Sequence, residues 1–355
     1  MSFPPTAHEF GFELAVCGWA EHEWPPSGKR RPALVARQLG WQRRRWDTIV
    51  VEVDPAAFEA RLAFGERSIG SDLRHVLLHA PTEWTYYRDA LPEPSYPWRY
   101  VREAIHAGAA RDLVEKRKRN GRIEIKRRGP YEPWVDRIVA IENKPDLDAS
   151  AARRLADQLE RDVAAGLAEE VWLATARTGE RVEPALLENL PSEVGILNVG
   201  DEGASVLWHP RTLDAAGPGI DVLDRAATDE DAARIDVLSP DEKAEKRLGI
   251  AERALERGWR AYVDGMRPDC AHFELERGRY GYRPWCGAFE RGQTPRDCGS
   301  RCRAFEPEPP GDRAGGWPVE GGPGQTVDEV LAARRRRRRQ SVSSSSISER
   351  GTESR

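Results

Sequence analysis

Residues 137–175 restrict the fold most strongly, because an apolar strand, an amphipathic helix and a second apolar strand follow one another directly. The strands read RIVAIEN and EVWLATA, and the residues between them repeat Leu155, Leu159, Val163 and Leu167 at helical intervals. Two strands joined through a helix lie parallel in one sheet and are connected by a right-handed crossover. The sequence therefore predicts an α/β fold.

Other elements follow from the same kind of pattern. Apolar spacing predicts a first helix over residues 8–23, and Ser239 begins a later helix with Pro240 and Glu242 in a capping box. Either Asp148 or Ser150 caps the crossover helix. Further strands are expected at residues 47–53, 122–128, 193–200 and 204–210, with 122–128 and 137–143 paired as a hairpin.

Residues 56–120 are predicted to be helical insertions that end in the basic run RDLVEKRKRNGR. That run suits either a solvated helix end or a contact with phosphate groups. We expect three parts of the chain: an α/β domain over 1–212, a helical and cysteine-bearing segment over 213–312, and a disordered tail over 313–355. The tail is rich in Pro and Gly, then in Arg and Ser, which is typical of disorder.

The composition and the apolar pattern argue against a membrane-spanning protein and against a secreted one. The formal net charge is -4 over 355 residues, and no apolar run reaches the ~18 residues that a membrane-spanning helix needs. The first ten residues lack the basic and apolar regions of a signal peptide. We therefore expect a cytoplasmic protein with no membrane partner.

The strand around residues 134–148 carries charge where a buried strand would carry only apolar residues. Glu142 and Lys144 are two positions apart, so their side chains point to the same face. A surface ion pair on an edge strand is one explanation. The other is a metal centre, in which Glu142 binds Mg²⁺ or Mn²⁺ and Lys144 orients water or stabilises charge on a phosphate.

The surrounding order of elements resembles the PD-(D/E)XK nuclease superfamily: an Asp, an apolar strand into E-x-K, a helix with a Gln, and another apolar strand. The resemblance covers residues 8–210 and implies a restriction-endonuclease-like core, a mixed sheet flanked by helices. It also implies catalytic roles for a set of residues that comprises Glu13, Asp136, Glu142, Lys144 and Gln158.

A narrower resemblance concerns the predicted crossover helix. The spacing Gln158-x-x-x-Asp162 is similar to the Gln-x-x-x-Tyr motif of the RecB-like subgroup, with Asp162 in the place of the tyrosine. The whole chain also resembles a family of uncharacterised proteins from halophilic archaea. The resemblance to the nucleases implies a DNA substrate, which includes single-stranded and branched DNA as candidates, and a role in DNA repair or defence.

The identity of the Asp that completes the metal site is open. Six residues of straight strand would separate Asp136 from Glu142 by ~20 Å, too far to share one ion. Either the chain bends near Asp136, or Asp54 at the end of the strand 47–53 replaces it. A turn-forming Asp before proline is the structural alternative for Asp54.

Four of the five cysteines lie close together in the sequence: Cys270, Cys286, Cys298 and Cys302. Four thiolates complete either a tetrahedral Zn²⁺ site or a four-iron iron–sulfur cluster. The spacing lacks the C-x2-C pairs that are usual for zinc, so the metal stays open. Cys17 is a candidate upstream ligand, although its place on the apolar face of the first helix favours a core role.

Three functions therefore remain after the sequence has been read. The first is a Mg²⁺-dependent DNA nuclease with a C-terminal four-cysteine metal segment. The second is a catalytically inactive nucleic-acid-binding protein on the same fold. The third is an unrelated enzyme with an ion-paired strand.

Overall fold

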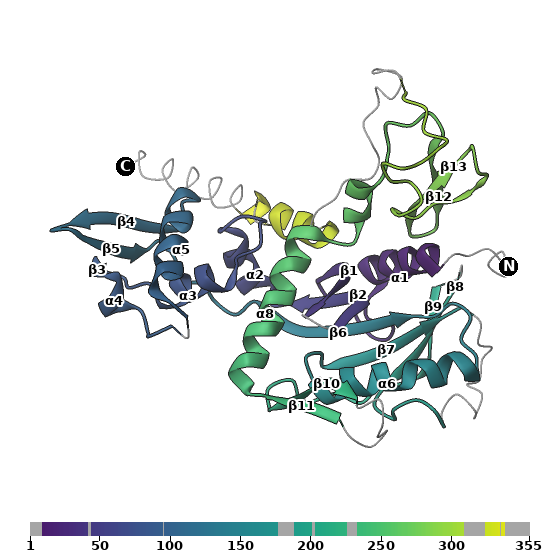
Figure 1. The fold of residues 1–355 in the computed structure, drawn as a ribbon, viewed down its shortest axis with the longest axis horizontal. Coiled ribbons are helices and arrows are strands. Elements are labelled where there is room, and N and C mark those ends of the chain that lie inside the picture. Colours follow the sequence, from purple (N-terminus) through teal and green to yellow (C-terminus); the bar gives the residue numbers. More distant parts are fainter. Residues whose placement is uncertain are drawn as a thin grey trace, which may run out of the picture. The chain divides into compact units, whose positions relative to one another are not determined.

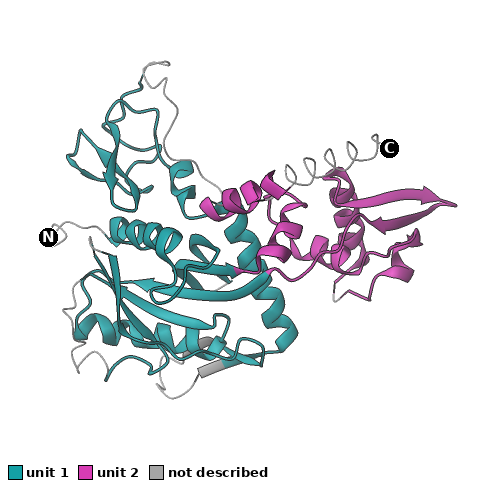
Figure 2. Cartoon of the chain, turned by 180° about the vertical axis from the view of Figure 1, so that it is seen from behind, with its two compact units in different colours: residues 1–52, 135–324 teal, residues 53–134, 325–355 magenta. Residues whose placement is uncertain are grey.

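The computed structural model describes residues 9–41, 44–94, 96–176, 188–200, 203–225, 233–308, 324–333 and 335–337. The chain divides into two compact units, which Figure 2 colours separately. Unit 1 comprises residues 1–52 and 135–324, and unit 2 comprises residues 53–134 and 325–355. Unit 2 is thus inserted into unit 1 and completed by the C-terminal residues.

Unit 1 is built on a six-stranded mixed sheet in the order β1-β2-β6-β7-β8-β9. Its strands are β1 (Ala33–Trp41), β2 (Arg44–Val53), β6 (Val135–Asn143), β7 (Glu170–Thr175), β8 (Gly195–Gly200) and β9 (Gly203–Trp208). The β6–β7 and β7–β8 pairs are parallel, and the outer β1–β2 and β8–β9 pairs are antiparallel. The predicted strand–helix–strand crossover is confirmed, with α6 (Ala149–Ala165) between β6 and β7.

Two contacts fix the direction of β2 against β6. The Asp47 carboxylate near the start of β2 accepts a hydrogen bond from the Asn143 backbone N at the end of β6. The Asp54 backbone N, just after β2, donates to the Trp134 carbonyl just before β6. The two strands therefore run antiparallel, and the start of β2 lies beside the carboxyl end of β6.

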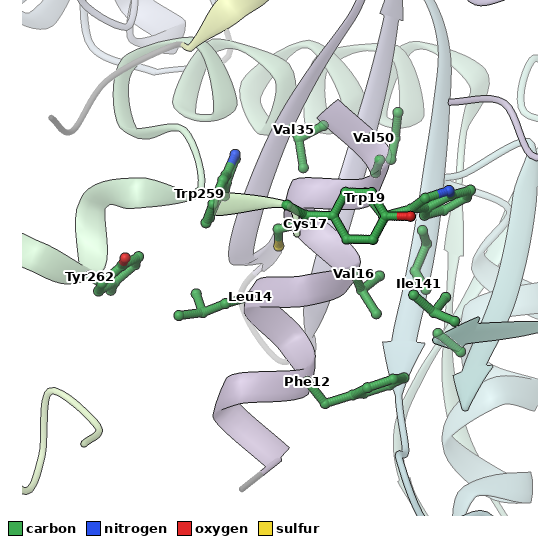
Figure 3. Packing of buried hydrophobic residues seen from close by; sticks show 14 of the residues in the cluster. Phe12, Leu14, Val16, Cys17, Trp19, Val35, Val50, Ile141, Trp259 and Tyr262 are labelled. Carbon is green, nitrogen blue, oxygen red and sulfur yellow. The ribbon is translucent and has the colours of Figure 1, made fainter. Parts of the chain in front are cut away.

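Helices cover both faces of this sheet. Helix α1 (Glu9–Glu23) packs on one face, where Phe12, Val16 and Trp19 belong to the same core cluster as Val50 and Ile141 of the strands (Figure 3). Helix α6 packs on the other face, where Leu159 meets Val171 and Leu173. Asp148 caps α6 by accepting from the Ala151 backbone N, so the first of the two predicted caps is the one used.

The remaining elements of unit 1 extend this core. Helix α8 (Pro240–Arg257) begins with the predicted capping box and packs against β1. The others are β10 (Gly219–Arg225), β11 (Ala233–Leu238), the 3₁₀ helix η1 (Arg260–Gly265), β12 (Phe273–Gly278), β13 (Gly281–Cys286) and β14 (Arg291–Gly292). Within the described helices, none is both long and apolar enough to cross a membrane.

The cysteine-bearing segment shares the core of α1. Trp259 and Tyr262 lie in the same cluster as α1 (Figure 3). Gly18 of α1 approaches the turn between β12 and β13 so closely that an added Cβ would lie 2.2 Å from the Tyr280 carbonyl oxygen. The structure therefore does not divide the chain at residue 212, because the α8 and cysteine segments are part of unit 1.

Unit 2 combines short helices with a three-stranded sheet in the order β3-β5-β4. Its elements are α2 (Pro55–Leu62), α3 (Ser71–His79), β3 (Thr85–Tyr86), α4 (Tyr87–Ala90), α5 (Trp98–Ala110), β4 (Val114–Arg119) and β5 (Arg122–Arg127). The predicted helical insertions are present in this unit. The basic run that follows them is a strand and not a helix end, because β4 and β5 pair as a hairpin.

Two further expectations need correction. Residues 122–128 do not pair with 137–143, because an Asn120-Gly121 turn returns β5 onto β4. The expected disordered tail over 313–355 contains a helix at residues 325–333, in which Thr326 and Val327 are buried. The rest of that tail lies outside the described residues, apart from Gly324 and residues 335–337.

Candidate active site

A polar cleft lies where β6 ends. Its volume is about 360 Å³, and it is lined by Glu9, Phe10, Glu13, Gln38, Asp47, Glu142, Asn143 and Thr294. Four of these residues carry carboxylates, and they come from three elements of the central fold: Glu9 and Glu13 from α1, Asp47 from β2 and Glu142 from β6. Clusters of partly buried carboxylates are costly unless a cation or a catalytic role compensates.

Asp47 is the residue that the sequence analysis missed. It lies near the start of β2, and its Oδ2 accepts a hydrogen bond of 3.0 Å from the Asn143 backbone N. Burial, and after it the negative charge of Glu142, raise the pKa of Asp47 to about 6. Because β2 and β6 are antiparallel, the start of the strand and not its end faces Glu142.

Glu13 is buried on α1 and is tied to β1. Arg37 donates to both of its carboxylate oxygens, from Nε at 3.1 Å and from Nη2 at 2.8 Å. The pKa of Glu13 is nevertheless raised, because its loss of hydration outweighs the attraction of Arg37. Glu13, one of the residues that the sequence suggested for the site, lines the cleft.

Gln38 links Glu13 with Asp47. Its Nε2 donates to Glu13 Oε1 at 2.9 Å and to Asp47 Oδ1 at 3.0 Å, so two carboxylates share one nitrogen. Gln38 has φ of 53°, in the left-handed region, and it interrupts the ladder between β1 and β2. This local backbone irregularity turns an amide side chain into the cleft.

Glu142 lies in the cleft but is held by an arginine. Arg44 of β2 donates to Glu142 Oε2 at 2.9 Å and to both oxygens of Asp162 on α6, the shorter contact being 2.7 Å. Burial raises the pKa of Asp162, and Arg44 opposes that rise. The arginine is thus a clamp that joins β2, β6 and α6 behind the cleft.

Lys144 lies at the edge of the cleft. Its Nζ donates to Glu9 Oε1 at 3.1 Å and lies 3.8 Å from Asp146 Oδ1. Glu9 lines the cleft, and Lys144 itself does not. Lys144 therefore lies beside the carboxylates of the cleft, and its side chain is turned toward Glu9 of α1.

Three predicted residues are not brought to the cleft. Asp136 is exposed at the opposite end of β6 from Glu142, and the strand does not bend enough to return it. Asp54 caps α2, where its carboxylate accepts from the backbone N atoms of Ala56 and Ala57. Gln158 is half-buried on α6, one turn before Asp162, and is not among the residues that line the cleft.

The four cysteines of the C-terminal segment line a single small cavity of about 10 Å³, together with Phe273 and Phe305. Cys270 precedes β12, Cys286 ends β13, and Cys298 and Cys302 follow β14. None of the four forms a disulfide, and burial raises the pKa of the Cys298 thiol. Cys17 is instead a core residue of α1, with its sulfur 3.3 Å from Thr48 Oγ1.

Neither the carboxylates of the cleft nor the four cysteines of the C-terminal segment are arranged around a common point where a metal ion would be held. Across the described residues, no three His, Cys, Asp or Glu side chains are arranged to hold a metal ion. In the cleft the reason is visible in the contacts, because Glu142 is turned to Arg44 and Glu13 to Arg37.

Comparisons with known proteins identify a family and no function. No curated protein and no solved structure matches the chain. One family model, described as "Family of unknown function (DUF5787)", matches residues 34–307. That range includes Asp47, Glu142 and the four neighbouring cysteines, and it begins after Glu13. The chain therefore belongs to the DUF5787 family of unknown function.

Proposed function

We propose that this protein is a divalent-metal-dependent nuclease of the PD-(D/E)XK type that hydrolyses phosphodiester bonds in DNA. The observation that carries the proposal is the approach of Glu13, Asp47 and Glu142 to one cleft, from a helix and two adjacent strands. Asp47 takes the place that the resemblance gave to Asp136. The mixed sheet flanked by helices is compatible with a restriction-endonuclease-like core.

The cleft contains a donor set that suits Mg²⁺ or Mn²⁺. Hard cations prefer carboxylate and amide oxygens, which Asp47 and Glu142 supply at the start of β2 and the end of β6. Asn143 also lines the cleft, and its buried Oδ1 accepts no hydrogen bond within the described structure. A polar oxygen of this kind is costly to bury without a partner, and a bound cation or its water would provide one.

In this proposal, the residues in and beside the cleft have different roles. Asp47 and Glu142 would hold the metal, while Glu13 and Gln38 would fix the position of Asp47 and hold water at the cleft. The bound metal would polarise the phosphate and lower the pKa of a water molecule. Lys144 would stabilise negative charge on the phosphate after exchanging its contact with Glu9 for one with the substrate.

Arg44 favours a second function, a catalytically inactive nucleic-acid-binding protein on the same fold. Its guanidinium already pairs with Glu142 and Asp162, which reduces the need for a metal at this position. In this alternative the arginine clamp is purely structural, and the cleft binds no cation. The two functions differ in one measurable property, because only the nuclease requires divalent metal.

DNA cleavage by the full-length protein tests the proposal, with linear, single-stranded and branched DNA each assayed in Mg²⁺ and in Mn²⁺. Glu142→Ala should abolish cleavage and leave the fold intact, since strand pairing does not depend on that side chain. Asp136→Ala is the matched control, because Asp136 is exposed at the other end of the same strand. Equal cleavage by the wild type and Glu142→Ala would refute the assignment.

Lys144→Ala separates chemistry from binding. We expect kcat to fall while the affinity for DNA is retained, because the proposed contact gains strength in the transition state. A loss confined to binding would instead make Lys144 a phosphate anchor.

We further propose that the four cysteines of the C-terminal segment bind a metal, either Zn²⁺ or a four-iron iron–sulfur cluster. The support is that all four thiols, from three separate stretches of chain, line the same cavity. A space of about 10 Å³ admits roughly one water-sized sphere, which favours a single ion over a cluster. Thiolates are the ligands that structural zinc sites use.

Metal analysis of protein purified without oxygen tests this second site. The Zn²⁺ hypothesis predicts about one zinc per chain, and the cluster predicts about four irons with broad visible absorption. Cys298→Ser with Cys302→Ser should release the metal and expose the segment to protease, whereas Cys17→Ser should retain the metal. Metal-free protein with a protease-resistant segment would make these thiols ordinary packing residues.

A further inference from the structure

The hairpin of unit 2 is built as a projecting arm. Strands β4 and β5 pair over their whole length and are joined by Asn120 and Gly121, with φ of 49° and 76°. Positive φ at both central residues is the signature of a tight type I′ turn. In Figures 1 and 2 the tip of the hairpin points away from the helices of unit 2.

The net charge of this arm is strongly positive. Residues 114–128 contain eight basic and two acidic side chains, a net charge of +6, in a chain whose total net charge is -4. The positive charge is therefore concentrated here while the rest of the protein is acidic. Self-repulsion on a short hairpin destabilises it, so such a concentration needs a compensating ligand or a functional reason.

Most of these cations have no acidic partner in the part of the chain that the structure describes. Glu124 accepts from Arg117 at 2.6 Å, and Arg128 pairs with Asp112. Within the described residues, no ion pair involves a second group of cations, which consists of Lys118, Arg119, Arg122, Lys126 and Arg127. These side chains are largely exposed, with Lys126 half-buried.

One face of the hairpin combines cations with aromatic rings. The strand register places Arg117, Arg119, Arg122 and Lys126 on the same face as Tyr86 of β3. The two acidic residues, Glu115 and Glu124, lie on this face too, so cations outnumber acids on it by four to two. The Arg117 guanidinium lies 4.4 Å from the centre of the Trp84 ring, and that of Arg122 lies 5.2 Å from the centre of the Tyr86 ring. Stacking on a ring holds a guanidinium in place while its N–H groups stay available.

We propose that this face of the β4–β5 hairpin binds the phosphate backbone of duplex DNA and so holds the substrate. A two-stranded ribbon has the width that the major groove admits, and arginine forks match phosphate oxygens. The two rings are already covered by Arg117 and Arg122, which favours phosphate contacts over stacking of unpaired bases. The inference deepens the proposed function, on which it rests for the choice of DNA.

The test is the salt dependence of binding to a labelled duplex, measured by fluorescence anisotropy in EDTA so that no cleavage occurs. The hairpin variant carries Arg119→Gln, Arg122→Gln and Lys126→Gln. Loss of three phosphate contacts should reduce the slope of log K against log salt by about 2 to 3. From about 50 mM to about 200 mM salt, wild-type affinity should therefore fall roughly 40-fold more than that of the variant.

A variant matched in charge controls for net charge alone. Arg153→Gln, Arg154→Gln and Arg257→Gln remove three exposed cations from α6 and α8, and the wild-type slope should be retained. Equal slopes for the wild type and the hairpin variant would overturn the proposal. If the triple hairpin variant misfolds, Arg119→Gln alone, beside the turn, should reduce the slope by about 0.9.

Other ligands give different results. Preference for single-stranded over duplex DNA, or hairpin-dependent binding to phosphatidylserine vesicles without hairpin-dependent binding to DNA, would refute the duplex assignment. Failure of the nuclease proposal is separable from failure of this one. Hairpin-dependent DNA binding without cleavage in Mg²⁺ would leave the inference standing, and cleavage with hairpin-independent binding would remove the inference alone.

Discussion

Replacing Asp47 by Asn should stabilise the metal-free protein at pH 8. The pKa of Asp47 is about 6 in the folded protein, against an ordinary value of 3.8, chiefly because burial disfavours its charge. At 1.36 kcal/mol for each pKa unit, keeping this carboxylate ionised costs up to about 3 kcal/mol of folding free energy. Rearrangement of the contact with Gln38 should reduce the gain to about 1–3 kcal/mol.

The dependence on pH has a definite sign. A raised pKa means that the folded state binds the proton more tightly than the unfolded state. The wild type therefore loses stability as pH rises from about 4 to about 6, and the penalty is complete above that range. Asp47→Asn lacks this titration, so its advantage should be largest at pH 8 and should vanish near pH 4.

Urea unfolding followed by tryptophan fluorescence in EDTA measures this difference. Asp136→Asn, at the exposed end of β6, is the control and should stay within about 0.5 kcal/mol of the wild type. Added Mg²⁺ should narrow the gap between the wild type and Asp47→Asn, because only the intact site binds the cation. If Asp47→Asn were less stable than the wild type at pH 8, or its effect were independent of pH, the reasoning would fail.

Three further predictions concern packing within each of the two units and are measured as urea midpoints. Gly18→Ala should cost about 1–3 kcal/mol because its Cβ would collide with the Tyr280 backbone, whereas Gly11→Ala on the same helix meets nothing within 4 Å and should be neutral or stabilising. Asp162→Ala should cost about 3 kcal/mol by removing the buried main partner of half-buried Arg44, and a change below about 1 kcal/mol would contradict the proposed clamp. Val327→Ala should destabilise unit 2, because Val327 is buried; an unchanged midpoint would show that the 325–333 helix is not packed.

Local patterns in the sequence were enough to predict many of the helices and strands. Apolar periodicity located α1, the β6–α6–β7 crossover and β8–β9, and the Ser239 capping box located the start of α8. Strand pairing is set by turns and by long-range packing, which such patterns do not contain. The hairpin partner of 122–128 was therefore misassigned, and β1 was not anticipated, although Asn120-Gly121 was a turn signal available in the sequence.

The candidate site was predicted in part for the same reason. Glu13 and Glu142 lie in the cleft and Lys144 lies at its edge, because each follows from a helix or strand that was predicted correctly. Asp47 was missed because the direction of β2 decides which end of the strand meets Glu142. The strand DTIVVEV begins with this aspartate, so an antiparallel arrangement would have selected it over Asp54.

Binding of Mn²⁺ to the full-length protein, measured by isothermal titration calorimetry, tests the central claim most directly. The claim is that the carboxylates of α1, β2 and β6 form a divalent-metal site. The wild type and Asp136→Asn should bind Mn²⁺ at a saturable site from which Mg²⁺ displaces it. Asp47→Asn and Glu142→Gln should lose this Mn²⁺ binding. Identical isotherms for the wild type and Glu142→Gln, or no binding by the wild type, would contradict a metal-dependent nuclease and favour the inactive nucleic-acid-binding protein.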